Sequence, residues 1–148
     1  MKSKMILAAA TLSIGLAGCA TVEEAVIEKV ADTYNATLTG SQEVGGGDPD
    51  GYAKAEISVA DRLDQICYDV GDVRGIGPIT AAHIHKGARG VNGPPVLTLK
   101  PAREGGIKGC EKAPDWLQDA VKTNFTGYYV NLHTAEFPDG AIRGQLGE

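Results

Sequence analysis

Several features that mark common functional classes are missing from this chain of 148 residues. Histidine is scarce, with three copies, and no Gly-x-Ser-x-Gly segment is present to form the nucleophile turn of an α/β-hydrolase. Positive charge is in deficit, because 14 Lys and Arg residues stand against 19 Asp and Glu residues and give a net charge of −5. Nucleic-acid-binding surfaces are basic, so the composition excludes a nucleic-acid partner. A Met-rich or Cys-rich run is also lacking, which argues modestly against a dedicated copper carrier.

Apolar runs long enough to span a membrane are absent, and the chain begins with a short one. Residues 5–16 form an apolar stretch behind Lys2 and Lys4, a pattern typical of a signal peptide. The stretch ends in a Leu-Ala-Gly-Cys sequence that resembles the lipobox of bacterial lipoproteins. We therefore expect a signal peptide over residues 1–18 and a lipid on Cys19, the first residue of the mature chain.

The lipid would attach an exported protein to a membrane, since several acyl chains together anchor a protein stably. Residue 20 is Ala and not the Asp that usually marks retention in the inner membrane, so we expect the outer membrane of a bacterial cell envelope. Residues 19–33 would form a tether, either a short helix or flexible, and residues 34–148 the folded domain. Loss of the two lysines of the signal peptide would change the net charge from −5 to −7.

Two further cysteines remain in the mature chain. Export places them in an oxidising compartment, where such a pair usually forms a disulfide, so we expect a bridge between Cys67 and Cys110. Metal ligation is the alternative, but neither cysteine lies near the histidines in the sequence.

Short segments of alternating polar and apolar residues, separated by Gly, Pro and Asp turns, follow one another from residue 34 to residue 146. This pattern is typical of an all-β fold, and we expect a Greek-key-like β-sandwich or barrel. Residues 113–123 differ, because Pro114 and Asp115 precede apolar residues at helical spacing and predict one short helix. The expected strands span residues 34–39, 52–60, 65–70, 81–85, 96–99, 128–133 and 141–146.

All three histidines fall in two short segments. His83 and His85 occupy alternate positions of one expected strand, so their imidazoles face the same side. His133 lies on the polar side of residues 128–133, and Arg143 lies on the polar side of the next expected strand, which a hairpin turn would pair with it. Imidazole is the commonest protein metal ligand, so these side chains predict a metal site outside the hydrophobic core. Solvated histidines on a polar sheet face are the alternative.

These segments resemble the CHRD (chordin) domain, and the resemblance covers most of the chain from Tyr34 to Leu146. In place of the Pro-Pro that family members frequently carry after a Glu-Val pair, this chain has Gly45 and Gly46. The matching elements are Ala36 to Val44, Gly51 to Val59, Ala82 to Gly87 with Asn92 to Val96, and Tyr129 to Leu146.

Some bacterial CHRD proteins are associated with copper-dependent superoxide dismutation, and the motifs here also resemble the copper half-site of Cu/Zn superoxide dismutase. The resemblance implies copper on His83, His85 and His133. It also implies that Arg143 draws in the superoxide anion, with Lys86 and Arg89 as further steering charges. A fourth copper histidine and the ligands of the zinc half-site are missing, so at most a copper-only centre is implied.

The sequence is compatible with other functions. Three histidines and a water form the pattern of catalytic zinc, which would give hydrolysis or hydration, and imidazole suits zinc, copper, iron and nickel alike. The domain is alternatively a non-catalytic binding module with no metal and an unidentified protein partner, or a metal-storage protein of the envelope.

Overall fold

The computed structural model describes residues 31–101 and 106–148, and these ranges contain eight strands, one α-helix and three short 3-10 turns. The predicted all-β class with one short helix is confirmed. The helix α2 starts two residues later than expected because Pro114 forms its N-cap. The elements are β1 (Asp32–Thr39), β2 (Tyr52–Ala60), β3 (Gln65–Arg74), β4 (Ile79–Lys86), β5 (Pro95–Thr98), β6 (Ile107–Lys112), α2 (Asp115–Thr123), β7 (Tyr128–Thr134) and β8 (Ile142–Gln145).

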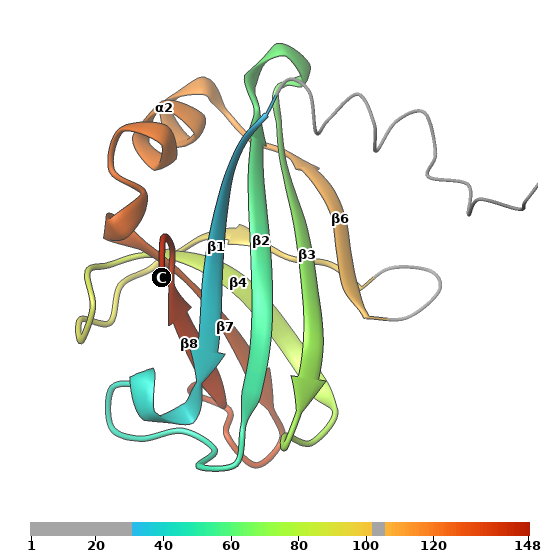
Figure 1. The fold of residues 1–148 in the computed structure, drawn as a ribbon, viewed down its shortest axis with the longest axis vertical. Coiled ribbons are helices and arrows are strands. Elements are labelled where there is room, and N and C mark those ends of the chain that lie inside the picture. Colours follow the sequence, from blue (N-terminus) through green and yellow to red (C-terminus); the bar gives the residue numbers. More distant parts are fainter. Residues whose placement is uncertain (1–30, 102–105) are drawn as a thin grey trace, which may run out of the picture.

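The strands form one antiparallel sheet in the order β5-β4-β7-β8-β1-β2-β3-β6. This sheet curls into a half-barrel, with β1, β2, β3 and β6 in front and β4 and β7 crossing behind them in Figure 1. The curl occurs where β8 meets β1, because these two strands share a single paired position, Thr39 with Arg143. On the open side, the Lys100 N–H donates to Tyr68 Oη at 2.8 Å, which ties the chain after β5 to β3.

The hydrophobic core fills the space between the two halves of the curled sheet. Alternate strand residues face inward, and the apolar positions expected from the sequence, such as Val130, Leu132 and Ile142, have no exposed surface. Leu117 and Val121 of α2 close one end of this space (Figure 1). Gln118 is buried beside them, and its side-chain amide donates to the Ala113 carbonyl just before the helix at 2.7 Å.

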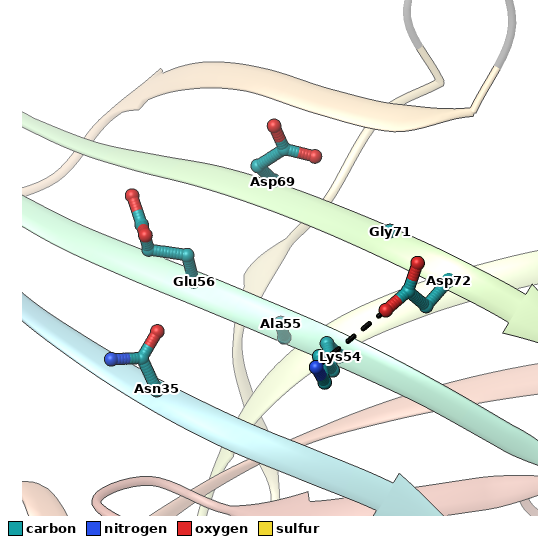
Figure 2. Close-up of a pocket in the computed structure, with 7 residues that line it drawn as sticks. All are labelled: Asn35, Lys54, Ala55, Glu56, Asp69, Gly71 and Asp72. Carbon is teal, nitrogen blue, oxygen red and sulfur yellow. Dashed lines mark ion pairs between the residues drawn. The ribbon is translucent and has the colours of Figure 1, made fainter.

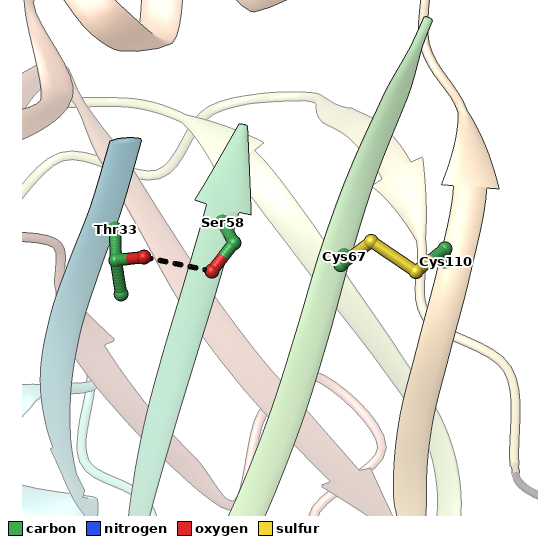
Figure 3. Close-up of a disulfide and its surroundings, with 4 residues drawn as sticks. All are labelled: Thr33, Ser58, Cys67 and Cys110. Atoms are coloured by element: carbon green, nitrogen blue, oxygen red, sulfur yellow. Dashed lines mark hydrogen bonds between the residues drawn. A yellow bond between two sulfur atoms is a disulfide. The ribbon is translucent and has the colours of Figure 1, made fainter. Parts of the chain in front are cut away.

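Strand β6 was not expected from the sequence, because its segment contains one large apolar residue, Ile107, among charged residues. Pairing with β3 determines its conformation, and the register places Cys67 directly opposite Cys110. The predicted Cys67–Cys110 disulfide is confirmed, and it links these two strands on the outer face of the sheet (Figure 3).

The outer face of β1, β2 and β3 is polar. Asn35, Glu56 and Asp69 form one cross-strand row, and Lys54 lies 3.7 Å from Asp72 in the neighbouring row (Figure 2). These groups are exposed or half-buried, and the ion pair is solvent-accessible at both ends. The polar side chains on the outer face of the front half of the sheet are therefore in contact with solvent.

The expected signal peptide, the lipidated Cys19 and most of the expected tether lie outside the described residues. Strand β1 begins at Asp32, so the last two residues of the expected tether, Asp32 and Thr33, belong to the sheet. Among the described residues, no helix has the length and apolar character needed to cross a membrane.

Candidate metal centre

The three histidines come together on the outer face of the rear half of the sheet, on β4 and β7. In their antiparallel register His83 is opposite Asn131, His85 is opposite Tyr129, and His133 is opposite Ala81. Directly paired residues share a face, so both strands direct these side chains to the same side. The sequence did not show whether these two strands are neighbours, and the structure pairs them directly.

The imidazoles are in mutual contact. His83 Nδ1 lies 3.2 Å from His133 Nε2, and the ring centroids of His83 and His85 are 5.5 Å apart. One ligand atom from each ring lies within 4.8 Å of the others, so the group could hold a metal ion. Two nitrogens bound to one metal at about 2.1 Å are at most about 4.2 Å apart, so a small side-chain rotation suffices.

Main-chain carbonyls fix the orientation of two of these rings. His85 Nδ1 lies 2.8 Å from the Gly93 oxygen, and His133 Nδ1 lies 2.9 Å from the Pro138 oxygen. A carbonyl oxygen only accepts, so Nδ1 carries the proton in both rings. In the neutral imidazoles the lone pair is then on Nε2, the nitrogen that His133 directs toward His83.

His85 Nε2 is buried and has no hydrogen-bond partner. A buried polar atom without a partner is costly, and a metal ion is one group that would satisfy a lone pair at this position. Burial lowers the pKa of His85, although the Gly93 carbonyl and the Asn131 side chain oppose this shift. Burial followed by repulsion from His133 and His85 lowers the pKa of His83. Both shifts favour neutral imidazole, the form that binds metals.

A loop from Gly87 to Gly93, here called the His85 loop, covers part of this face. The Tyr129 ring stacks on His85 with 4.8 Å between centroids, and the Tyr129 hydroxyl accepts the Gly93 N–H at 3.2 Å. Gly93, which accepts the hydrogen bond from His85, is therefore itself held by Tyr129, the residue opposite His85 in the sheet.

Arg143 is brought to the same face but is enclosed, with 1% of its surface exposed. Its Nη2 donates to the Ala88 carbonyl at 2.9 Å and to Gln145 at 3.4 Å, and its Nη1 donates to Asn92 Oδ1 at 3.4 Å. The sequence predicted a polar position for this guanidinium. The loop that buries Arg143 belongs to another hairpin, so the alternation of residues along its own strand could not predict this burial.

Glu43 and Asn131 also belong to this region, and the sequence-based reasoning assigned them no role. The Glu43 carboxyl packs against Gly140, and burial raises its pKa while Arg143 and Asn131 oppose the rise. Asn131 is 3% exposed, and its Oδ1 has no partner. Tyr129, Asn131 and His133 lie on the same side of one strand, so the sequence could have predicted Asn131 near the histidines. Glu43 lies in a loop, where no such alternation predicts its position.

The two other basic residues differ in availability. Lys86 is exposed at the end of β4, directly after His85. Arg89 forms an ion pair with Glu148, so its charge is partly neutralised. Of the two expected steering residues, Lys86 is therefore the freer one.

No curated protein and no solved structure matches this chain. The CHRD domain matches residues 34–146, a range that runs from β1 to the residue after β8 and includes all three histidines and Arg143. A match over this much of the sequence assigns the family, and the chain belongs to the CHRD domain family.

Proposed function

We propose that this CHRD protein binds a copper ion on His83, His85 and His133 and consumes superoxide at that centre. The observation that carries the proposal is the pair of carbonyl-anchored imidazoles, His85 and His133. The Nε2 atom of His85 has no partner, and the Nε2 atom of His133 pairs with His83, the third histidine of the group. Solvated histidines on a polar face would need neither this anchoring nor the burial of His85 Nε2.

Bound copper would supply a one-electron couple that can both oxidise and reduce superoxide. The residues of the chain contribute orientation and charge. The two carbonyl contacts orient His85 and His133 before any ligand binds, which reduces the ordering cost of binding. Lys86 places a positive charge on the exposed rim, and this local attraction matters because the whole chain is negative.

The test begins with Cu(II) titration of the full-length chain in detergent, followed by stopped-flow measurement of superoxide decay. We expect one copper per chain, a nitrogen-ligand spectrum in electron paramagnetic resonance, and loss of both signals in His83→Ala, His85→Ala and His133→Ala. Glu56→Gln with Asp72→Asn, on the polar outer face of Figure 2, is the matched control for adventitious carboxylate binding.

Copper binding that survives all three alanine substitutions would refute the proposed site. Stoichiometric binding without superoxide consumption would point to storage or delivery. Zinc competes for the same ligands, and tighter binding of zinc than copper would favour a hydrolytic centre, contrary to the usual order of metal affinities.

We further propose that the protein is an exported lipoprotein held in the bacterial envelope, at the outer membrane, by a lipid on Cys19. The support is the Lys2, Lys4 and apolar stretch before this cysteine. In a Gram-negative host, Cys19→Ser should abolish incorporation of labelled fatty acid and move the protein out of the membrane fraction. A variant that stays labelled and sediments with membranes would contradict the lipid anchor.

A further inference from the structure

We propose that Arg143 is a positioning residue for His85, acting through Tyr129 and the His85 loop, and not a group that contacts the superoxide anion. This inference rests on the proposed metal site. It assigns to the buried guanidinium a definite task, which is to hold the carbonyl that selects the tautomer of one ligand.

The first step is the contact between Arg143 and the loop. Its guanidinium donates to the Ala88 carbonyl at 2.9 Å and to Asn92 Oδ1 at 3.4 Å, two positions near the ends of the loop. Gln145, two residues further along β8, donates to the Gly87 carbonyl at 2.9 Å. Strand β8 therefore holds the loop at three points through two buried side chains.

The second step is Tyr129, which lies in contact with both Arg143 and His85. The Arg143 guanidinium carbon is 3.4 Å from the centre of the Tyr129 ring, and His85 stacks on this ring with an angle of 11° between planes. Because the Tyr129 hydroxyl also accepts the Gly93 N–H, the ring position and the loop position are coupled. A cation over the face of a desolvated tyrosine is attracted to the ring, which stabilises this arrangement.

The position of the proton on the His85 ring depends on Gly93. Gly93 presents its N–H to Tyr129 and its carbonyl oxygen to His85 Nδ1. A displaced Gly93 carbonyl would leave the ring free to carry its proton on either nitrogen, and protonated Nε2 has no lone pair for a metal. Arg143 is thus connected to the ligand atom by a continuous series of contacts.

A steering role requires a guanidinium that an anion can reach. Arg143 is 1% exposed, and its donors are directed to protein oxygen atoms. An anion would have to displace the His85 loop to contact it. The geometry therefore favours positioning over anion capture.

The test uses the full-length chain labelled with ¹⁵N-histidine and free of metal, in detergent micelles. Since the chain has three histidines, each ring can be assigned in long-range ¹⁵N–¹H spectra. In the wild type we expect His85 to be protonated on Nδ1. In Arg143→Gln we expect a mixture of His85 tautomers, while His133, held by Pro138, is unchanged.

The metal-loaded chain provides a second readout. Arg143→Gln should weaken Cu(II) binding by about 10- to 100-fold and alter the copper hyperfine coupling, as substitutions of groups that orient a ligand do. Tyr129→Phe retains the ring and removes the hydroxyl, so it should shift the His85 tautomer in the same direction and carry the test if Arg143→Gln does not fold. Arg74→Gln is the matched control, because Arg74 lies 3.7 Å over the Tyr52 ring on another part of the sheet.

An unchanged His85 tautomer in Arg143→Gln and Tyr129→Phe would overturn the positioning role. So would unchanged copper affinity in Arg143→Gln with a superoxide rate that loses its dependence on ionic strength, since that result identifies steering. A wild type that binds no copper would refute the proposed function alone, because the metal-free spectra still decide whether Arg143 positions His85.

Discussion

At the scale of single residues, two main-chain oxygens give this face its chemical character. The carbonyls of Gly93 and Pro138 each accept a hydrogen bond from the Nδ1–H of a histidine, and in the neutral rings of His85 and His133 the lone pair is then on Nε2. His83 differs, because its Nδ1 faces His133 and no such carbonyl contact to its ring is present in the described structure. The group therefore consists of two imidazoles held by carbonyls and one, His83, without such a contact.

Glu43 gives a prediction about pH and stability. Burial raises the pKa of its carboxyl, so between the ordinary pKa near 4.5 and the raised pKa the folded state binds more protons than the unfolded state. Its stabilising contribution is present below the ordinary value and is lost as pH rises through the folded value. Glu43→Gln lacks this loss, so its stability relative to the wild type should increase with pH across that window.

Urea unfolding of the wild type and Glu43→Gln, measured at several values between about pH 4 and pH 8, tests this sign. A stability difference that does not vary with pH would show that the carboxyl is not held in a desolvated position.

At the scale of elements, the His85 loop between β4 and β5 determines how the ligand face is covered. Position 93 in this loop has no room for a side chain, because a Cβ at Gly93 would overlap the carbonyl oxygen of Lys86. The obstacle is backbone, so the loop and not a side chain would have to move.

Gly93→Ala should therefore displace the carbonyl that holds His85. We expect a loss of about 1–3 kcal/mol in stability from the forced contact, and at least a ~10-fold loss in Cu(II) affinity. Calorimetric titration and urea unfolding measure the two effects. Gly77→Ala is the control, because a Cβ at Gly77 meets no atom within 4 Å. Equal copper affinity in Gly93→Ala and Gly77→Ala would show that the loop does not hold His85 for metal binding.

The disulfide belongs to a different element pair, β3 and β6, on the front half of the sheet. Cys67→Ser combined with Cys110→Ser should cost about 2–4 kcal/mol, because the bridge closes a long loop in the unfolded chain. Copper affinity should not change, since the histidines lie on β4 and β7. A loss of copper binding comparable to that of His133→Ala would contradict this separation.

At the scale of the whole molecule, the curl of one sheet places the disulfide on the outer face of the front half (Figure 3). The histidines lie on the outer face of the rear half, on β4 and β7, and the core lies between the two halves. Residues 83 and 133 are 50 positions apart, so the complete ligand set exists only in the folded chain. Metal binding should therefore be coupled to folding.

Copper at about 100 times its dissociation constant should raise the free energy of unfolding by about 2.7 kcal/mol, less any binding to the unfolded chain. His83 and His85 stay adjacent after unfolding, whereas His133 does not. His133→Ala should thus lose most of the stabilisation, which urea unfolding with and without Cu(II) will measure. Equal stabilisation of the wild type and His133→Ala would place copper outside the three-histidine site.

The sequence by itself determined the all-β class, the short helix, the disulfide pair and the common face of His83 and His85. These follow from local rules, because side chains alternate along a strand and paired cysteines oxidise after export. It missed β6, whose residues Ile107–Lys112 lack an alternating apolar pattern and form a strand because β3 lies beside them.

Tertiary structure alone decided the environment of the ligand face. The adjacency of β4 and β7 brought His133 to His83, and the His85 loop buried Arg143 and presented the Gly93 carbonyl to His85. The contacts of His133 with His83 and of Arg143 with Ala88 join residues 50 and 55 positions apart, and the contact of Gly93 with His85 depends on how the loop between them folds back. Periodicity reports which side of its own strand a residue occupies, but not what a distant segment places over that side.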